Sequence, residues 1–582
     1  MIHNQLNRKT IIKYGIILLS IIGLMVCTAL LFPQVRWKIM DLAWRMVLKR
    51  ELGSMFESWS SAIFSFAMGG ICLILLIDYC TFTASGKTLV RAIKQEMTDS
   101  LYEIDFRSFL KPVLLMSGIY LLGLLTIIRS NFLYMDDIAQ SVLGYRAWYD
   151  WSRYVIMLLS YVIQPEISLT DISPITHFLS VLILALSSVL LVYILCERKI
   201  TTLRLLASIP LGLSPYILEC LSYKISGQYM AFPVLVCIVP FLFVTRRKAF
   251  FFSSVIALLI MCMTYQVASG IYLMIAVVLG FQDWNNKRKS LKEILSFWAT
   301  AFIAFCSALL IFKFFLMRDV SSYVSTEMHP IPRLISGTLG NIKSYALIIN
   351  SDFGLIWKTG IVLVLLFFII KSTLATAQKK IFSFFVSILV VGIMFIMSYG
   401  IYSLLAEPLF YPRGLYGFGV FLAIFCIIIV SDFKKIAAIT VLALNWCLFV
   451  FAFSYGNALA DQARYAEFRI GILLNDLSVL YPNPDRAETL IQINNSIDFT
   501  PSVKNIARHN PIIERLVPKR LGEDYYGTYY IIHHFYFNRF AQENIPEYTS
   551  VDFNSMNLPV VLDTFYHTIK SDGKHILIIL KQ

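Results

Sequence analysis

The run PITHFLSVLILALSSVLLVYIL, residues 174–195, decides the fold class of this chain. A helix of this length crosses the roughly 30 Å hydrocarbon core of a bilayer. Comparable runs recur along the 582 residues, of which 58% are hydrophobic and 15% charged, with a mean hydropathy of +0.70. Continuous apolar runs argue against a transmembrane barrel, whose strands alternate apolar and polar residues. The sequence therefore predicts a polytopic α-helical membrane protein.

The apolar runs divide into about thirteen predicted transmembrane helices by the same length rule. The first is too long for the apolar part of a signal peptide and lacks a small-residue cleavage site, so we expect it to be retained. The predicted spans are 11–32, 60–83, 112–129, 174–195, 202–220, 228–245, 249–264, 266–281, 295–316, 355–370, 381–399, 414–431 and 436–455.

The net charge of +14 is interpreted as a signal of membrane orientation and not of nucleic-acid binding. Lysine and arginine lie mostly in the short loops, and seven clusters fall on one face, which the positive-inside rule assigns to the cytoplasm. A cluster at residues 36–50 disagrees and is interpreted as an amphipathic helix on the membrane surface. All ten cysteines lie in or beside apolar runs, which argues against disulfides and a cysteine-based zinc site.

This orientation divides the chain into three parts. Residues 1–111 hold two additional N-terminal spans and a cytoplasmic loop, and residues 112–455 form the transmembrane core with its first outer loop at 130–173. Residues 456–582 have the composition of a soluble protein and are predicted to form an extracytoplasmic α/β or α+β domain. Within that domain, the pattern predicts a helix over 457–480 and a hairpin over 560–581, in which strands 560–562 and 575–580 flank the turn Ser571-Asp572-Gly573-Lys574.

The adjacent acids Asp136 and Asp137 are the strongest indication of chemistry. Carboxylates at the mouth of a membrane helix are costly unless they face water, a cation or a reacting group. A carboxylate there can deprotonate a hydroxyl. The same loop holds cations and aromatic rings, and the aromatic rings could either stack on a sugar or belong to an interfacial belt. These residues are Arg146, Trp148, Trp151 and Arg153.

Arg413, in Tyr411-Pro412-Arg413-Gly414 at the outer end of an apolar span, is the second candidate. Its guanidinium could hold a lipid phosphate in bidentate geometry, or it could simply reach to the interface as an ordinary flanking arginine. Glu219 and Lys224 flank another short turn, and we interpret them as an ion pair. The sequence contains no Walker loop and no Rossmann fingerprint, so any activated group must arrive with the substrate.

The segment Asp136–Gly144, followed by Trp148 and Arg153, resembles the first periplasmic loop of phage-type serotype-conversion glucosyltransferases. These membrane enzymes modify bacterial O-antigen and belong to the broad GT-C class. Tyr223, then Tyr265-Gln266, and then Pro412-Arg413 follow in the order expected for that family. The resemblance covers roughly residues 112–455.

The resemblance implies a reaction on the periplasmic face of the bacterial inner membrane. A polyprenyl-phosphate sugar would donate a hexosyl group, with inversion, to a hydroxyl of O-antigen or lipopolysaccharide. Asp136 or Asp137 would be the general base, and Arg413, Arg153 and Arg146 would bind the donor phosphate. A divalent cation between the two acids is possible but is not predicted, and no cofactor is implied. The implied substrate-binding residues are Trp148, Trp151, Tyr223, Lys224, Tyr265, Gln266 and Tyr411.

Three other functions are compatible with a many-span chain of this kind. A lipid-linked sugar transporter or flippase would carry charges through the bilayer midplane, whereas here they gather at the outer ends of the spans. An O-antigen polymerase or ligase would use arginine and histidine in a large late loop, for which Arg318, His329 and Arg333 are the candidates. A non-enzymatic assembly protein would leave the acid pair without a role.

Overall fold

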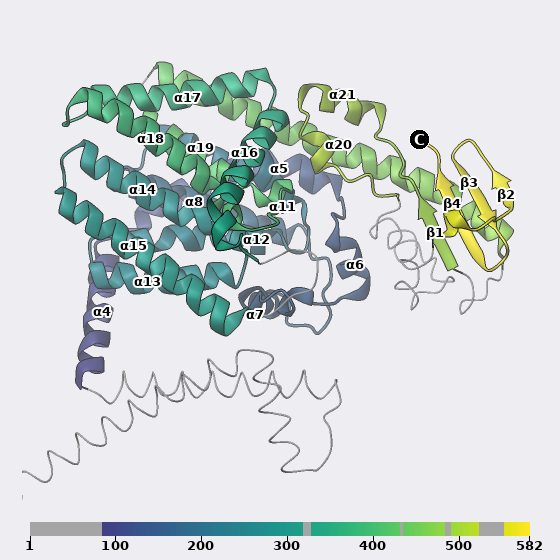
Figure 1. The fold of residues 1–582 in the computed structure, drawn as a ribbon, viewed down its shortest axis with the longest axis horizontal. Coiled ribbons are helices and arrows are strands. Elements are labelled where there is room, and N and C mark those ends of the chain that lie inside the picture. Colours follow the sequence, from purple (N-terminus) through teal and green to yellow (C-terminus); the bar gives the residue numbers. More distant parts are fainter. Residues whose placement is uncertain (1–83, 318–326, 431–434, 483–489, 523–551) are drawn as a thin grey trace, which may run out of the picture. The chain divides into compact units, whose positions relative to one another are not determined.

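The computed structural model describes residues 84–317, 327–430, 435–482, 490–522 and 552–582, and Figure 1 shows it as a mostly helical molecule with one small sheet. The helices up to residue 311 are α4 (Ala84–Tyr102), α5 (Leu110–Ser130), α6 (Asp136–Leu143), α7 (Tyr154–Ile163), α8 (Ile175–Leu195), α9 (Thr202–Ala207), α10 (Pro210–Leu213), α11 (Pro215–Ser222), α12 (Gly227–Ile238), α13 (Arg247–Cys262), α14 (Ser269–Asn285) and α15 (Leu291–Ile311). The later helices are α16 (Leu334–Asp352), α17 (Leu355–Leu374), α18 (Lys380–Ser398), α19 (Gly417–Ile429), α20 (Ile436–Leu480), α21 (Pro501–His509) and α22 (Ile513–Leu516).

Seven helices among the described residues are long and apolar enough to cross a bilayer, which confirms a polytopic membrane protein. They are Phe106–Ser130, Ile175–Leu195, Gln266–Asn285, Leu291–Leu316, Leu355–Leu374, Lys380–Ser398 and Ile436–Leu480. The predicted spans 11–32 and 60–83 lie outside the described residues. Three other predicted spans correspond to α12, α13 and α19, each shorter than eighteen residues. The count of about thirteen therefore stays a prediction.

The predicted span 202–220 is a broken helix. Residues Thr202–Leu213 and Pro215–Ser222 meet at an angle of 60°. Pro215 has no backbone N–H to continue the ladder, and its ring restricts Ser214 to the extended conformation that it adopts here, with ψ 148°. The break turns α11 out of line and thereby sets the direction in which its acidic residue Glu219 points.

Helices differ sharply in how far neighbouring protein covers them. Every residue of α19 is buried, although the helix is too short to span a bilayer by itself. Most residues of α17 and α18 are not buried, and the exposed side chains include many leucines, isoleucines and phenylalanines. Apolar side chains on such surfaces are expected where a helix faces lipid, because lipid tails are as apolar as they are.

Residues 84–104 form one compact unit with residues 243–253 and 306–317, while the other described residues belong to a second unit. Within the first unit, the backbone N–H of Ala249 donates to Glu96 Oε2 at 3.0 Å. Arg246 lies 3.7 Å from the carboxylate of Glu103. The candidate site lies wholly in the second unit.

The helix that contains the last predicted span continues beyond the end predicted for that span. α20 is one continuous helix of 45 residues, so the predicted division at residue 456 falls inside it. Its first half is strongly apolar, and its second half continues with charged residues to a four-stranded sheet (Figure 1). A separate soluble domain over 456–582 therefore stays a prediction, and one continuous helix leads from the core toward the sheet.

The sheet has the strand order β1-β4-β3-β2. β1 (Leu490–Asn494) is parallel to β4 (His575–Leu580), and β3 (His567–Ser571) lies antiparallel between β4 and β2 (Val560–Asp563). The predicted turn at 571–574 is confirmed, with Gly573 at φ +94°. The predicted pairing of 560–562 with 575–580 was wrong. Residues 575–580 pair with β3, because β2 ends at Asp563 and the chain forms this third strand before the turn.

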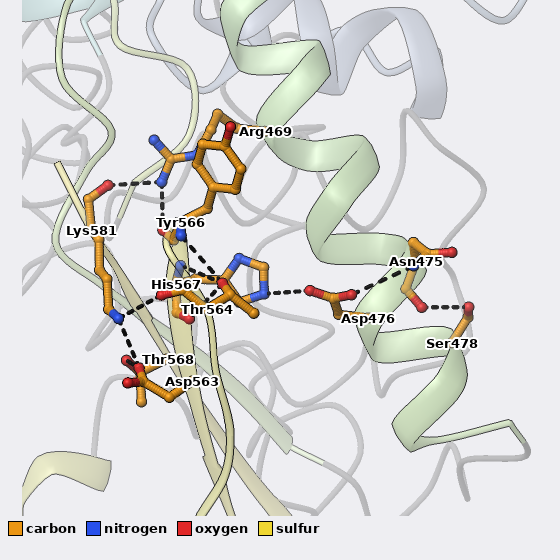
Figure 2. A network of polar contacts seen from close by, with 10 residues as sticks. All are labelled: Arg469, Asn475, Asp476, Ser478, Asp563, Thr564, Tyr566, His567, Thr568 and Lys581. Atoms are coloured by element: carbon orange, nitrogen blue, oxygen red, sulfur yellow. Dashed lines mark hydrogen bonds and ion pairs between the residues drawn. The ribbon is translucent and has the colours of Figure 1, made fainter.

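A polar network joins the sheet to the end of α20 (Figure 2). Arg469 on α20 donates to the backbone carbonyls of Tyr566 at 2.6 Å and Lys581 at 2.7 Å. His567 Nε2 lies 3.1 Å from Asp476 Oδ2. Burial lowers the pKa of His567, although the Asp476 carboxylate opposes that shift. These contacts fix the sheet against the helix that leads back to the membrane.

Candidate functional site

The acid pair lies in the turn that leads into α6. Met135, immediately before the helix, has a φ of +47°, a left-handed conformation that is strained for a residue with a side chain. Asp136 is exposed, whereas Asp137 is completely buried. Asp137 accepts three backbone hydrogen bonds, from Tyr134 at 3.1 Å, Lys224 at 2.8 Å and Ile225 at 3.1 Å.

The structure therefore gives the two acids different surroundings. Burial raises the pKa of Asp137 to about 7, while the three N–H donors act in the opposite direction. Its two oxygens are occupied with the chain around Tyr134 and with the turn after α11, so it fastens these two segments together. Asp136 is the acid that a substrate could reach.

Arg413 lies opposite an acid that the sequence had not linked to it. Its Nη1 is 3.2 Å from Glu219 Oε1, and its backbone N–H donates to Glu219 Oε2. The Glu219 side chain is only 2% exposed and that of Arg413 is 16% exposed. The interpretation of Glu219 and Lys224 as a pair was wrong, because Pro215 starts α11 in a direction that points Glu219 at the turn Pro412–Gly414.

A second arginine approaches the same group of rings. The Arg153 guanidinium lies 5.3 Å from the centre of the Tyr265 ring, and the Arg413 guanidinium lies 4.8 Å from that of Tyr411. Burial raises the pKa of Tyr402, and the charges of Arg153 and Arg413 both oppose the rise. Both guanidinium groups therefore lie within electrostatic reach of one phenol, although 260 residues of chain separate them.

Tyr223 connects the acid turn with this arginine pair. Its ring packs edge-on against Tyr134 at a centroid distance of 4.9 Å. Burial raises the pKa of Tyr223, and the charges of Arg413, Glu219 and Asp136 also act on the phenol. The backbone N–H of Tyr134 donates to Asp137, and its hydroxyl lies 3.4 Å from Glu219 Oε1. Because Glu219 pairs with Arg413, the acid turn and Arg413 belong to one connected cluster of contacts.

Lys224 has an acidic partner other than Glu219. Its Nζ pairs with Asp171 and donates to Asn131 Oδ1 at 2.6 Å. Partial burial raises the pKa of Asp171, but hydrogen bonds from Lys224 and Ser173 outweigh it and leave that pKa below its usual value. A cavity of about 110 Å³ is lined in part by Lys224, Asn131 and His177.

Arg146 and Trp148 have contacts that differ from those predicted for them. Arg146 donates to Ser160 Oγ at 3.1 Å and to the Gln164 carbonyl at 2.9 Å, and its guanidinium lies 4.2 Å from the centre of the Tyr161 ring. Trp148 is buried and packs edge-on against Tyr229 at 5.3 Å. These contacts hold the 130–173 loop together, and substrate binding by either residue stays a prediction.

The other predicted substrate-binding residues lie at varied depths. Tyr411 is half exposed beneath Arg413, and Trp151 is partly buried. Tyr265 is buried and stacks on Tyr416 at 6.0 Å, while Gln266 donates to the Cys262 carbonyl at 2.9 Å. Of these, Tyr265 and Tyr411 lie directly beneath the two arginines.

Known proteins share most of the segment that carries this site. Residues 125–425 match the family model described as glucosyl transferase GtrII. The chain belongs to the GtrII glucosyltransferase family. As a member of the GtrII family it is a glycosyltransferase, and the predicted resemblance is confirmed. The matched residues include Asp136, Glu219 and Arg413, whereas all of α20 and the whole sheet lie beyond them.

One curated relative of this GtrII-family protein comes from Salmonella phage P22 and is described as an uncharacterized 55.3 kDa protein in the gtrB 5′ region. It is 22% identical over 443 residues, which cover 72% of the present chain and 88% of the phage protein. No solved structure matches the chain.

Glu219 is the site residue that the sequence analysis placed wrongly. A carboxylate inside an apolar helix is a strong signal by itself, because such groups are costly unless they are paired. Arg413, at the end of another span, carried the complementary signal. Only the fold could match the two, since they are 194 positions apart and Lys224 offered a nearer partner along the chain.

Proposed function

We propose that this GtrII-family enzyme transfers a glucosyl group from a polyprenyl-phosphate donor to a hydroxyl of O-antigen at the periplasmic face of the inner membrane. The acceptor oxygen attacks the anomeric carbon of the sugar, and the bond from that carbon to the phosphate oxygen breaks. The acceptor proton passes to the base, polyprenyl phosphate leaves, and the configuration inverts.

Asp136 is the base in this proposal. It is exposed at the N-terminus of α6, so an acceptor hydroxyl can reach it. Asp137 is the less suitable group, because its oxygens already accept three backbone hydrogen bonds in a buried position. The second acid therefore orients the first, and the strained Met135 between Tyr134 and the helix fixes the direction of Asp136.

Arg413 and Arg153 bind the departing phosphate in this proposal. The phosphate diester of the donor becomes a monoester as the bond to the sugar breaks and gains negative charge, and a guanidinium stabilises that charge best in a dry site. Glu219 holds Arg413 from behind and neutralises only one positive charge of the pair. Lipid-linked donors fit a site built at the ends of membrane helices.

The observation that best supports the proposal is the chain of contacts that joins the acid turn to the arginine, from Asp137 through Tyr134 and Glu219 to Arg413. A base and a phosphate-binding group must lie on either side of the anomeric carbon for an in-line displacement. The test is the glucose content of lipopolysaccharide in a host that makes the lipid-linked donor. Asp136→Asn should abolish glucosylation at normal membrane abundance, and an unchanged glucose content would refute the proposal.

A further inference from the structure

The short helix α22, far beyond the residues matched by the family, reaches into the candidate site. Leu516 is completely buried, and its carbonyl accepts hydrogen bonds from the Tyr134 hydroxyl at 2.8 Å and the Tyr455 hydroxyl at 3.3 Å. Tyr134 also lies 3.4 Å from Glu219 Oε1, and its backbone N–H binds Asp137. The C-terminal region therefore contacts the acid turn directly.

Arg515, the preceding residue, joins two further segments. One guanidinium nitrogen pairs with Asp352 at the end of α16, and the other donates to the backbone carbonyl of Phe410. Asp352 is only 2% exposed and also accepts a hydrogen bond from the Tyr216 hydroxyl at 2.8 Å. Tyr216 lies on α11, the same short helix that carries Glu219.

The Phe410 contact matters because Phe410 lies three residues before Arg413. Its ring stacks on Tyr399 at 5.5 Å, and the neighbouring Leu409 carbonyl accepts a hydrogen bond from the Tyr399 hydroxyl at 2.9 Å. Arg515 thus holds the start of the turn whose other end carries the Arg413 guanidinium. A planar guanidinium can bind a carboxylate and a carbonyl in two fixed directions, which a lysine cannot reproduce.

The hydrophobic core of the C-terminal region adds an independent contact to the acid turn. Ile138, the residue after Asp137, is buried in one cluster with Ile470 and Leu473 of α20 and with Ile576 and Ile578 of β4. The acid turn is therefore packed against α20 and the sheet while its Asp137 carboxylate is bonded to the turn after α11.

We propose that Arg515 is a positioning residue for donor binding: by bridging Asp352 and the Phe410 carbonyl, it sets the position of Arg413 relative to the acid turn. The C-terminal region is then a component of the catalytic site and not an appended module. This inference rests on the proposed role of Arg413 in binding the donor phosphate.

The experiment measures binding of undecaprenyl phosphate to the full-length protein in detergent, together with its thermal midpoint. The double variant Arg515→Met/Asp352→Asn removes both charges, so no unpaired carboxylate remains buried. Loss of a hydrogen bond to a charged group corresponds to roughly ten- to hundredfold in affinity, and we expect a decrease in that range with a nearly unchanged midpoint. Arg508→Met, at an exposed position on α21, is the matched control and should bind normally.

Arg515→Lys separates positioning from simple attachment of the C-terminal region. It keeps a cation beside Asp352 but loses the second arm to Phe410, so donor affinity should fall while the protein still accumulates. If the double variant does not accumulate, the donor affinity of Arg515→Lys alone tests the inference. Wild-type affinity in Arg515→Lys would overturn the inference. Absence of binding by the wild-type protein would instead refute the proposed donor.

Discussion

Replacement by asparagine should affect the two neighbouring acids differently: at Asp137 it should lower stability, and at Asp136 it should lower activity. The loss of stability at Asp137 can be calculated from its hydrogen bonds. Asp137 Oδ2 accepts from Tyr134 and Lys224, and Oδ1 accepts from Ile225. Asn at this position keeps one acceptor oxygen and places an NH₂ group against the remaining N–H donor. One buried donor then lacks its partner, which costs about 1–3 kcal/mol.

Asp137→Ala removes all three acceptor contacts. With about 1–3 kcal/mol for each buried donor, the sum is roughly 3–9 kcal/mol, and movement of water into the gap makes the upper end a bound. Asp136 is exposed, so Asp136→Asn should change stability by no more than about 0.5 kcal/mol. Its transfer rate should fall by about 10²–10⁴-fold, the usual contribution of a general base.

The assay combines two measurements on each purified variant. Thermal unfolding in detergent reports stability, and transfer of glucose from undecaprenyl-phosphate glucose to an O-antigen acceptor reports activity. We expect a lower midpoint for Asp137→Asn, a still lower one for Asp137→Ala, and a normal midpoint with almost no transfer for Asp136→Asn. A normal midpoint in Asp137→Ala, or normal transfer by Asp136→Asn, would show that the roles assigned to the two acids are incorrect.

Three further predictions concern other parts of the chain. Glu219→Gln removes the charge that orients Arg413, so kcat/KM for the lipid donor should fall roughly ten- to hundredfold, and an unchanged value would show that Glu219 does not position the arginine. Because the folded-state pKa of His567 lies below its usual 6.5, the unfolded state binds more protons, and the sheet should lose stability as the pH falls below about 6.5. Hydrogen exchange of β3 and β4 at pH 7.5 and 5.5, corrected for intrinsic rates, measures this loss, and His567→Gln should abolish the difference. Alkaline phosphatase fused after Gln582 should be active if the C-terminus is periplasmic, whereas an inactive fusion at normal abundance would reverse the topology.

Local patterns were sufficient to locate the acid turn and most of the helices. Asp136 and Asp137 stand out because charge beside a membrane span is costly, and each predicted span within the described residues coincides with a helix or a broken helix. The same reasoning could not tell Asp136 from Asp137. Adjacent residues have the same local sequence, and their difference comes from backbone donors at Lys224 and Ile225, which the chain brings in from a distant segment.

The long helix α20 shows where the composition signal misleads. The change from apolar to charged residues near 456 reflects a change in surroundings, yet helix propensity does not change there, so one helix continues across it. The hairpin error has a similar origin. The turn at 571–574 is a local signal, whereas the strand partner of residues 575–580 depends on β3. The polar composition of β3 did not predict a strand, although its alternate residues are buried.

The amino-acid sequence by itself determined that this protein is built from membrane helices, and it predicted a site around Asp136 and Arg413. Hydrophobic length and isolated charge are properties of short segments, and both can be read without knowing the fold. Only the tertiary structure decided that the buried Asp137 carboxylate binds the turn after α11, that Glu219 pairs with Arg413, and that Arg515 connects the C-terminal region to the site. Each of these pairs residues more than 80 positions apart, and such contacts depend on how the helices pack.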